Sequence, residues 1–199
     1  MFDQQFYEDQ QFKDLVIENE IIEDVDFQDC SFTKCTFTET SFRACKFRGC
    51  SFSDCDLSLV RVDHSAFKGV TFENCRVIGI NWPTASWGSK EDFVLVKPIV
   101  FFKCVLNYSS FVGLELEGLR LEKCIAKEVD FSEANLSQAN FQHTDFLESS
   151  FRNTDLTEAD FVDAKNYMID PSTNTIKKAR FSIPEAMALL YSMDIEIIE

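Results

Sequence analysis

The sequence has few of the residues from which common binding motifs are built. Its 6 glycines form no phosphate-binding loop, and neither of its 2 histidines lies at a zinc-ligand spacing from a cysteine. It has no apolar run of about eighteen residues, which a transmembrane helix requires, and its acidic start, MFDQQFYEDQ, is unlike a signal peptide. We therefore expect a cytoplasmic protein that binds no metal or other cofactor and does not enter a membrane.

The sequence is rich instead in large apolar residues that recur at every fifth position. One series runs from Phe12 to Trp87, and a second series, offset by one residue, runs from Phe101 to Phe161. Helices repeat every 3.6 residues or so and strands about every two, so a period of five fits neither. A strict period over this length predicts stacked structural repeats.

A smaller residue lies two positions before each large one, as Cys30 does before Phe32. Side chains two apart point the same way in an extended segment, so both are predicted to face inward. Four such segments would close a square coil of about twenty residues, and residues one coil apart should stack. Phenylalanine fills one predicted column completely at Phe12, Phe32, Phe52 and Phe72.

Pentads such as Ala134-Asn135-Leu136-Ser137-Gln138 resemble those of the pentapeptide-repeat proteins, over roughly residues 10–165. The resemblance implies the all-β fold of that family, a right-handed quadrilateral parallel β-helix. The chain is accordingly divided into an N-terminal cap (1–11), a first repeat block (12–87), an interruption (88–100), a second repeat block (101–165), and a C-terminal hairpin, helix and tail (166–199).

All eight cysteines occupy the smaller inward position of a pentad, and no two form a CxxC pair. They are Cys30, Cys35, Cys45, Cys50, Cys55, Cys75, Cys104 and Cys124. Free cysteine behaves as a small buried hydrophobe. Cys35, Cys55 and Cys75 should stack one per coil, but parallel side chains in a reducing compartment favour thiols over disulfides. We expect the cysteines to be packing residues.

The repeat pattern also argues against catalysis. Asp63, His64 and Ser65 have the residue types of a catalytic triad, but Ser65 is predicted to face inward and His64 outward, so they cannot form the required geometry. His143 takes the same outward position. The many carboxylates lie on a convex surface without the desolvated cleft that acid–base chemistry needs. We therefore expect that the protein is not an enzyme.

The interruption between the two blocks is one place where function is expected, because binding residues often lie where a scaffold is broken. The segment from Asn81 to Asp92, which leads into the interruption, contains proline, glycine and both tryptophans, and residues 93–100 that follow are mostly apolar. It is either an irregular coil with Trp82 and Trp87 inside it, or an extruded loop that contacts a partner. The residues that such a loop would present are Lys90, Glu91, Asp92 and Phe93.

The later coils are strongly acidic in a chain whose net charge is −15. The acidic residues that we select as candidate partner contacts are Glu115, Glu128, Asp130, Glu133, Asp145, Glu148, Asp155, Glu158 and Asp160. Glu128 and Glu148 are twenty residues apart and should stack, and Glu115 and Asp155 should align two coils apart. Stacked like charges repel by roughly 1 kcal/mol in water. They form either a solvated face or a negative strip for a basic protein groove, and direct binding of nucleic acid is not expected.

The C-terminal segment departs from the repeat. Residues 175–181 are predicted to form a hairpin, and Ser182 to Glu185 resembles a capping box that opens a helix ending near Ser192. The apolar residues of this helix are Met187, Leu189, Leu190, Tyr191 and Met193. Because a solenoid must cover its last coil, they form either a lid over that coil or a dimer contact.

The chain is similar to one group within the family in its acidic rod, its interruption and its C-terminal helix. That group binds DNA gyrase or topoisomerase IV as DNA mimics and protects against quinolones. The resemblance implies a non-enzymatic protein that binds a type II topoisomerase through residues 115–163 and 88–100, as a monomer or a C-terminal dimer. The alternative is an interaction scaffold for an unrelated protein partner.

Overall fold

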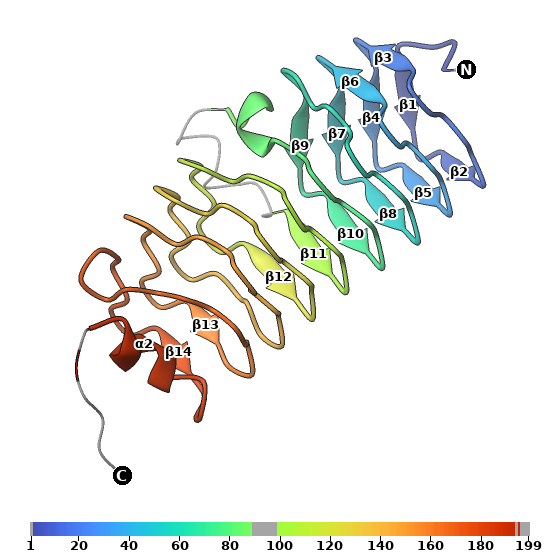
Figure 1. Ribbon diagram of the computed structural model, residues 1–199. Coiled ribbons are helices and arrows are strands. Elements are labelled where there is room, and N and C mark those ends of the chain that lie inside the picture. The colour runs from blue at the N-terminus through green and yellow to red at the C-terminus, as the bar shows by residue number, and fades with distance from the viewer. Residues whose placement is uncertain (1, 89–98, 194, 196–199) are drawn as a thin grey trace.

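The computed structural model describes residues 2–88, 99–193 and 195, which form a rod of stacked coils (Figure 1). Each coil has four sides, and successive coils pair in parallel with a spacing of twenty residues, as Phe32 does with Phe52. The large and small residues of each pentad point into the rod, as the period-five pattern predicts. The fold is therefore the expected quadrilateral parallel β-helix.

We number the sides in chain order. Side 1 begins with a four-stranded sheet made of β1 (Phe6–Glu8), β4 (Asp26–Gln28), β7 (Lys46–Arg48) and β9 (Ala66–Lys68). Side 2 carries a six-stranded sheet made of β2 (Gln11–Lys13), β5 (Ser31–Thr33), β8 (Ser51–Ser53), β10 (Thr71–Glu73), β11 (Val100–Phe102) and β12 (Arg120–Glu122). Further along side 2, β13 (Asp160–Phe161) pairs with β14 (Arg180–Phe181).

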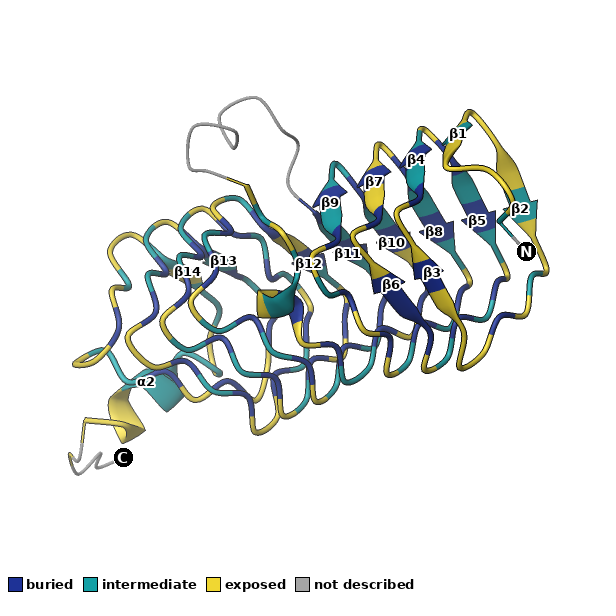
Figure 2. Ribbon diagram, turned by 90° about the horizontal axis from the view of Figure 1, so that it is seen from above, coloured by how far each residue is buried: buried dark blue, intermediate teal, exposed yellow. Residues whose placement is uncertain are grey.

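The other two sides are held mainly by single bridges. Side 3 runs through Val16, Thr36, Asp56, Arg76, Val105, Ile125 and Asp145. Side 4 starts with β3 (Ile21–Glu23) and β6 (Ser41–Arg43) and continues through Arg61, Asn81, Ser110, Asp130 and Ser150. Figure 2 shows the alternation of buried and exposed residues that results along each side.

At the corners between sides, the residue two positions after the large one has positive φ, as Ala44 (φ 50°) and Glu148 (φ 62°) do. This left-handed conformation suits glycine best and costs other residues free energy, least for asparagine and aspartate. We call the edge between sides 3 and 4 corner 3/4 and name the others likewise. The residues with positive φ at corner 3/4 are Asn19, Glu39, Leu59, Gly79, Tyr108, Glu128 and Glu148.

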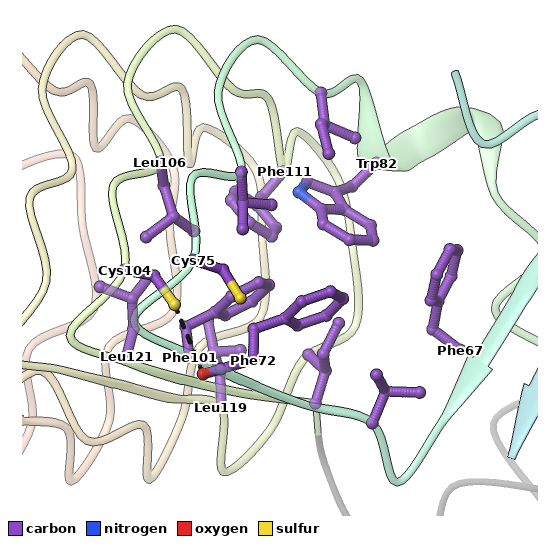
Figure 3. Close-up of a cluster of buried hydrophobic side chains, with 14 of the residues drawn as sticks. Phe67, Phe72, Cys75, Trp82, Phe101, Cys104, Leu106, Phe111, Leu119 and Leu121 are labelled. Atoms are coloured by element: carbon purple, nitrogen blue, oxygen red, sulfur yellow. Dashed lines mark hydrogen bonds between the residues drawn. The ribbon is translucent and has the colours of Figure 1, made fainter. Parts of the chain in front are cut away.

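The core is a set of stacked rings and aliphatic side chains. The rings of Phe32 and Phe52 lie 4.6 Å apart at 7°, which is a stacked arrangement. Trp82, buried to 1% exposure, stacks on Phe111 in a neighbouring coil (Figure 3). Ring pairs of this kind recur between successive coils, as for Phe27 and Phe47, so the core extends along the rod axis.

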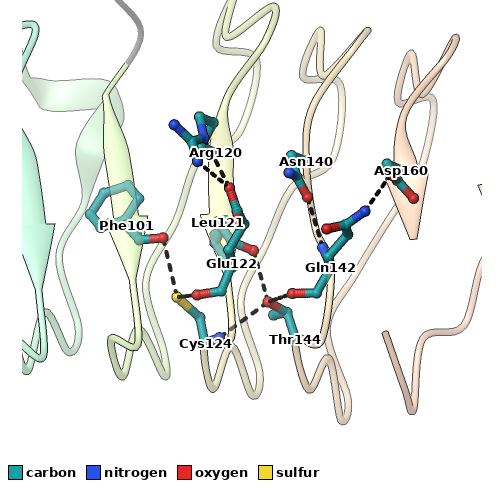
Figure 4. Close-up of polar contacts among 9 residues, drawn as sticks. All are labelled: Phe101, Arg120, Leu121, Glu122, Cys124, Asn140, Gln142, Thr144 and Asp160. Atoms are coloured by element: carbon teal, nitrogen blue, oxygen red, sulfur yellow. Dashed lines mark hydrogen bonds and ion pairs between the residues drawn. The ribbon is translucent and has the colours of Figure 1, made fainter. Parts of the chain in front are cut away.

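All eight cysteines are buried, free thiols, as expected. They also take part in hydrogen bonding: the Cys124 thiol donates to the Phe101 carbonyl of the preceding coil over 3.5 Å (Figure 4). In the next coil the Thr144 hydroxyl occupies the same place, donating to the Leu121 carbonyl at 2.7 Å and accepting from the Cys124 N–H at 3.2 Å. The inward small residue therefore connects coils as well as filling space.

The rod keeps its register across the interruption. Phe101 in β11 pairs with Phe72 in β10, which lies 29 residues earlier in the sequence, whereas paired residues elsewhere in this sheet are twenty apart. Just before the interruption the chain forms a short 3-10 helix, η1 (Trp82–Thr84), and the Trp87 ring nitrogen donates to the Trp82 carbonyl at 2.9 Å. Both tryptophans thus pack into the rod. The candidate contacts Lys90, Glu91, Asp92 and Phe93 lie outside the described residues.

The predicted C-terminal hairpin is wrong. Residues 175 and 180–181 pair in parallel with residues 155 and 160–161, so the segment forms a further part of the solenoid. The physical reason is that Ile176 and Phe181 keep the five-residue spacing of large apolar residues, and the Phe181 ring stacks on Phe161 at 5.1 Å. A stretch with that spacing buries its apolar side chains in the core, which a hairpin could not do.

The C-terminal helix is shorter than predicted, because the expected capping box does not cap it. The helix α2 spans Met187–Tyr191 and has no side-chain cap. Ser182 instead accepts a hydrogen bond from the Asp163 N–H at 2.9 Å, so its hydroxyl serves the preceding coil.

The N-terminal segment is already part of the repeat, because Tyr7 in β1 pairs with Phe27 in β4. Of the residues expected to form the cap, Phe2 packs on the end of the core. Its ring packs edge-on against the rings of Tyr7, Phe12 and Phe27 at 5.1–5.7 Å. The first coil therefore begins about five residues earlier than the expected boundary between residues 11 and 12.

Candidate protein-binding surface

The candidate acidic residues do not share one face of the rod. Glu128 and Glu148 lie at corner 3/4, with Asp130 directly after Glu128 on side 4. Glu133 lies at corner 4/1, beside Glu115 and Asp155 at the start of side 1. Glu158 lies at corner 1/2, Asp160 follows it at the start of side 2, and Asp145 lies on side 3. The selected charges wrap around the rod because pentads follow one another around its four sides.

Three of these carboxylates are neutralised by nearby cations. Asp160 pairs with Arg180 at 3.0 Å, Glu158 pairs with Lys178 at 3.0 Å, and Asp145 lies 3.8 Å from the Lys127 ammonium. Each cation comes from a neighbouring coil. Corner 1/2 is therefore a mixed-charge surface in the last coils and a weak candidate for binding a basic partner.

Other candidate carboxylates are used by the backbone of their own pentad. Asp130 accepts from the Ser132 N–H at 2.9 Å, and Asp155 accepts from both the N–H and the hydroxyl of Thr157. Such side-chain bonds to a backbone N–H two residues on are typical of tight turns. Their hydrogen bonds to these turns are by themselves a reason for aspartate at both positions, whether or not a partner binds there. The amide of Asn135 donates to Glu115 at 2.9 Å.

Glu128 and Glu148 are the best-placed pair for binding a cation. Both are exposed, both project from corner 3/4, and the Glu128 N–H donates to the carbonyl of Leu147, the residue preceding Glu148. Neither has an ion pair within 4 Å among the described residues. The predicted stacking of these two residues is thus confirmed. We call Glu128, Glu148 and Asp130 the acidic corner.

Tyr108 extends the acidic corner by one coil. It lies at corner 3/4 one coil before Glu128, and the residue is 62% exposed. A hydrogen bond to Glu128, together with the negative charge of Glu128 and Glu148, raises the pKa of Tyr108 above its usual value. The phenol therefore stays protonated over the physiological range and can act as a donor beside the carboxylates.

The C-terminal apolar residues divide into two groups. Leu189 packs against the core and Met187 is half-buried, while the Ser192 hydroxyl donates to the Ile169 carbonyl at 3.2 Å. In contrast, Leu190, Tyr191 and Met193 are 38%, 67% and 53% exposed. The helix therefore covers part of the last coil with one face and leaves its other face to solvent.

The residues that we judged non-catalytic lie as expected. Ser65 is buried in the rod while His64 and His143 are exposed, so Asp63, His64 and Ser65 do not converge. Within residues 2–88, 99–193 and 195, no three potential ligands lie close enough together to hold a metal ion. None of the helices in that part of the chain is long and apolar enough to cross a membrane.

Sequence reasoning missed one relationship among the inward residues. The thiol column Cys35, Cys55 and Cys75 continues through Cys104 and Cys124, since side 2 resumes at Phe101 directly after Phe72. The extra residues of the interruption hide this continuity. No count of pentads predicts it, because Phe101 pairs with a residue 29 positions earlier, which is not a multiple of five.

Family models for pentapeptide repeats match two parts of the sequence. The model described as "Pentapeptide repeat region" matches residues 25–111, and the model described as "Pentapeptide repeats (8 copies)" matches residues 134–165. The two matches lie on either side of residues 112–133, which the structure places in the same rod. No curated protein matches the sequence.

Solved structures resemble this chain over nearly its whole length. A trypsin-treated form of QnrB1, a plasmid-mediated fluoroquinolone resistance protein, matches with a TM-score of 0.60 and 19% identity over 98% of this chain and 99% of that chain. Full-length QnrB1 matches with the same TM-score of 0.60 and 19% identity, over 93% of this chain and 100% of that chain. A third structure is that of HetL, a pentapeptide repeat protein involved in heterocyst differentiation regulation from the cyanobacterium Nostoc sp. strain PCC 7120. It matches with a TM-score of 0.50 and 14% identity, over 89% of this chain and 87% of that chain. At these identities the likeness shows the fold alone.

Proposed function

This chain belongs to the pentapeptide-repeat family, and on that premise we propose that it is a non-catalytic, cytoplasmic protein-binding rod. Its acidic corner engages a basic groove on a protein partner. A type II topoisomerase, DNA gyrase or topoisomerase IV, is the candidate partner, and the consequence of binding is altered sensitivity to quinolones. The similarity to QnrB1 supports the choice of candidate.

The observation that carries the proposal is the stacking of Glu128 and Glu148 without a compensating cation among the described residues. Adjacent coils are about 4.8 Å apart, so two like charges at this spacing repel one another. A basic groove would relieve that repulsion. B-DNA presents one charge per 1.7 Å of axis or so, and a rod with carboxylates on successive coils imitates this pattern coarsely.

A charge-reversal experiment tests the acidic corner. Glu128→Lys/Glu148→Lys should abolish inhibition of gyrase supercoiling and any protection against ciprofloxacin. Lysine is tolerated at corners, as Lys34 and Lys123 show with φ near 55°. The matched control is Glu39→Lys/Asp54→Lys, which reverses two exposed corner carboxylates in the first block and should leave the effect unchanged.

Two outcomes would contradict the proposal. If the wild-type chain at micromolar concentration neither binds gyrase and topoisomerase IV nor changes their activity, neither enzyme is the partner. If binding survives Glu128→Lys/Glu148→Lys at low salt, the acidic corner is a solvated surface and the contact lies elsewhere.

The alternative function is an interaction scaffold for an unrelated protein. The exposed apolar residues of side 3, which include Ile125 and Leu147, favour it, since a surface that only imitated DNA would have no need of them. Binding of a purified partner that is weakened by apolar substitutions and not by high salt would support this alternative.

A C-terminal dimer is part of the same proposal. The exposed face of α2, with Leu190, Tyr191 and Met193, would be covered by the same face of a second copy, as a two-fold interface requires. Sedimentation of the wild type against Leu190→Ser/Tyr191→Ser measures this directly. A monomer at all concentrations for both proteins would leave α2 as a lid only.

A further inference from the structure

Away from the two ends of the rod, the exposed large apolar side chains lie on one side of it. Among the described residues between Ile22 and Tyr167, they are Leu59, Tyr108, Ile125 and Leu147, which are 41–62% exposed. All of them belong to side 3 or to corner 3/4. Half-buried Ile78 and Val105 lie on the same side. We call Leu59, Ile78, Val105, Tyr108, Ile125 and Leu147 the side-3 strip.

The strip has at least one member in each of five successive coils. Val105 pairs directly with Ile125, and the Leu59 N–H donates to the Ile78 carbonyl at 2.8 Å. The Leu59 side chain leans over the next coil, where a Cβ on Gly79 would come within 2.7 Å of its methyl group. At about 4.8 Å per coil, four coil spacings give a strip of about 19 Å.

This composition is not a general property of outward positions. The equivalent positions on side 2 are hydroxyl-bearing in three consecutive coils, with Ser31, Ser51 and Thr71. On side 4 they are Arg61, Asn81 and Ser110. Solvation and solubility would favour polar residues on all four sides, so the apolar strip on side 3 needs another explanation.

We propose that the side-3 strip binds an amphipathic α-helix of a partner protein, with the helix axis along the rod. The apolar face of the helix packs on the strip, and basic residues on its flank reach Glu128 and Glu148. This inference goes beyond the proposed function, because it requires neither a topoisomerase nor an imitation of DNA.

The spacing of the coils favours a helix over an extended strand. A helix presents an apolar side chain about once per turn of 5.4 Å, which differs from the coil spacing of about 4.8 Å by only about 0.6 Å. Over four spacings the mismatch is about 2.4 Å. A strand along the same direction presents a side chain on one face every 6.6–6.8 Å or so, and its mismatch would grow to about 7–8 Å.

The charges around the strip favour a cationic partner. Glu128 and Glu148 border it at corner 3/4, while Asp56 and Asp145 on side 3 are already paired with Arg76 and Lys127. A second copy of the chain would match the coil spacing, but it would bring two bodies of net charge −15 together. A basic amphipathic helix satisfies both the apolar residues and the free carboxylates.

Two synthetic peptides test the geometry. Both contain fourteen residues, about the length that spans the strip, and both contain only leucine and lysine in equal numbers. One has leucines three and four apart, the helical spacing, and the other alternates leucine and lysine. With the full-length protein at low salt, fluorescence anisotropy should give at least tenfold tighter binding of the helical-spacing peptide, with helix formation seen by circular dichroism.

Matched variants locate the contact. Leu59→Ser/Ile125→Ser/Leu147→Ser should weaken binding of the helical-spacing peptide at least tenfold, because it removes three apolar contacts. The control, Phe6→Ser/Val112→Ser/Val162→Ser, removes three outward apolar side chains from other sides and should change binding by less than twofold. Circular dichroism and thermal midpoints establish that both variants remain folded.

Equal affinity for the two peptides, or unchanged binding by the strip variant, would overturn the proposal and leave only charge attraction. A concentration-dependent dimer in sedimentation that is lost in the strip variant would assign the strip to a second copy instead. These readouts are separate from gyrase supercoiling and from Glu128→Lys/Glu148→Lys, so this inference and the proposed function can fail independently.

Discussion

The Ser65 hydroxyl joins two coils at the backbone of Cys45. It accepts the Cys45 N–H at 2.9 Å and donates to the Phe42 carbonyl at 3.0 Å, and all of these groups are buried. Cys45 itself makes the corresponding bond one coil earlier, donating its thiol to the Ile22 carbonyl at 3.3 Å. The small inward position is thus a hydrogen-bonding link that serine, threonine and cysteine can each supply.

Removing the hydroxyl should therefore destabilise the rod. Ser65→Ala leaves the Cys45 N–H and the Phe42 carbonyl without this partner, and we expect a loss of about 1–3 kcal/mol in the free energy of unfolding measured with urea. Ser65→Cys keeps a donor and an acceptor of the type used at Cys45 and should cost less than half as much. Equal losses for the two variants would show that shape alone matters at this position.

Because corner residues have positive φ, we expect alanine-to-glycine and glycine-to-alanine substitutions there to change stability in opposite directions. Ala44 has φ of 50° and Gly113 has φ of 68°, and a Cβ at Gly113 would meet no atom within 4 Å. Ala44→Gly should stabilise the protein by up to about 1 kcal/mol, while Gly113→Ala should destabilise it by about 1 kcal/mol, because only glycine adopts positive φ without strain.

A control separates this effect from the general cost of glycine. Thr33 lies in the middle of a sheet in β5, so Thr33→Gly should destabilise the rod. Thermal midpoints for the three variants give the comparison. A destabilising Ala44→Gly would mean that the entropy of the unfolded chain outweighs corner strain.

The buried thiols predict a loss of stability in alkaline solution. Burial raises the pKa of Cys45 to about 11 and that of Cys50 to about 12, against an ordinary value of 9.0. Between the ordinary pKa of 9.0 and these raised values, the two thiols ionise in the unfolded chain but stay protonated in the folded chain. Rising pH therefore favours the unfolded state. The urea midpoint should fall as pH rises from 8 to 11.

The contribution of the thiols can be isolated from that of lysine and tyrosine. In Cys45→Ser/Cys50→Ser the serine hydroxyls do not titrate in this range, so the fall in the urea midpoint should be shallower than in the wild type. Parallel pH profiles for the two proteins would exclude the thiols as its cause. Folded protein at pH 8 should also react with a thiol reagent only as fast as it unfolds.

The contact between Tyr108 and Glu128 predicts a measurable titration. Because the hydrogen bond and charge of Glu128 raise the pKa of Tyr108, Glu128→Gln should lower it. Ultraviolet difference titration can follow the change, with Tyr108→Phe identifying which of the four tyrosines is observed. Glu39→Gln, at the same corner in the first block, should leave the titration unchanged.

Much of the site could not be predicted from the sequence because the rod has four sides. The spacing of twenty placed Glu128 above Glu148 correctly, but residues five apart lie on adjacent sides, so the run from Glu115 to Asp160 does not form one face. The ion pairs Glu158–Lys178 and Asp160–Arg180 were also missed. Both cations lie in the segment expected to form a hairpin, and only its parallel pairing brings them beside the carboxylates.

The sequence by itself determined the coil: an apolar residue at every fifth position can be buried only if the chain turns four times in twenty residues, so the columns at Phe32 and Phe52 and the inward cysteines follow. Only the tertiary structure decided what the surface is. The pairing of β10 with β11 places the thiols of Cys75 and Cys104 in one column. The side of the rod on which each outward residue lies determines which surface residues become neighbours. Burial depends on a local spacing that each pentad carries, whereas neighbours on the surface come from different coils and are fixed only when those coils stack.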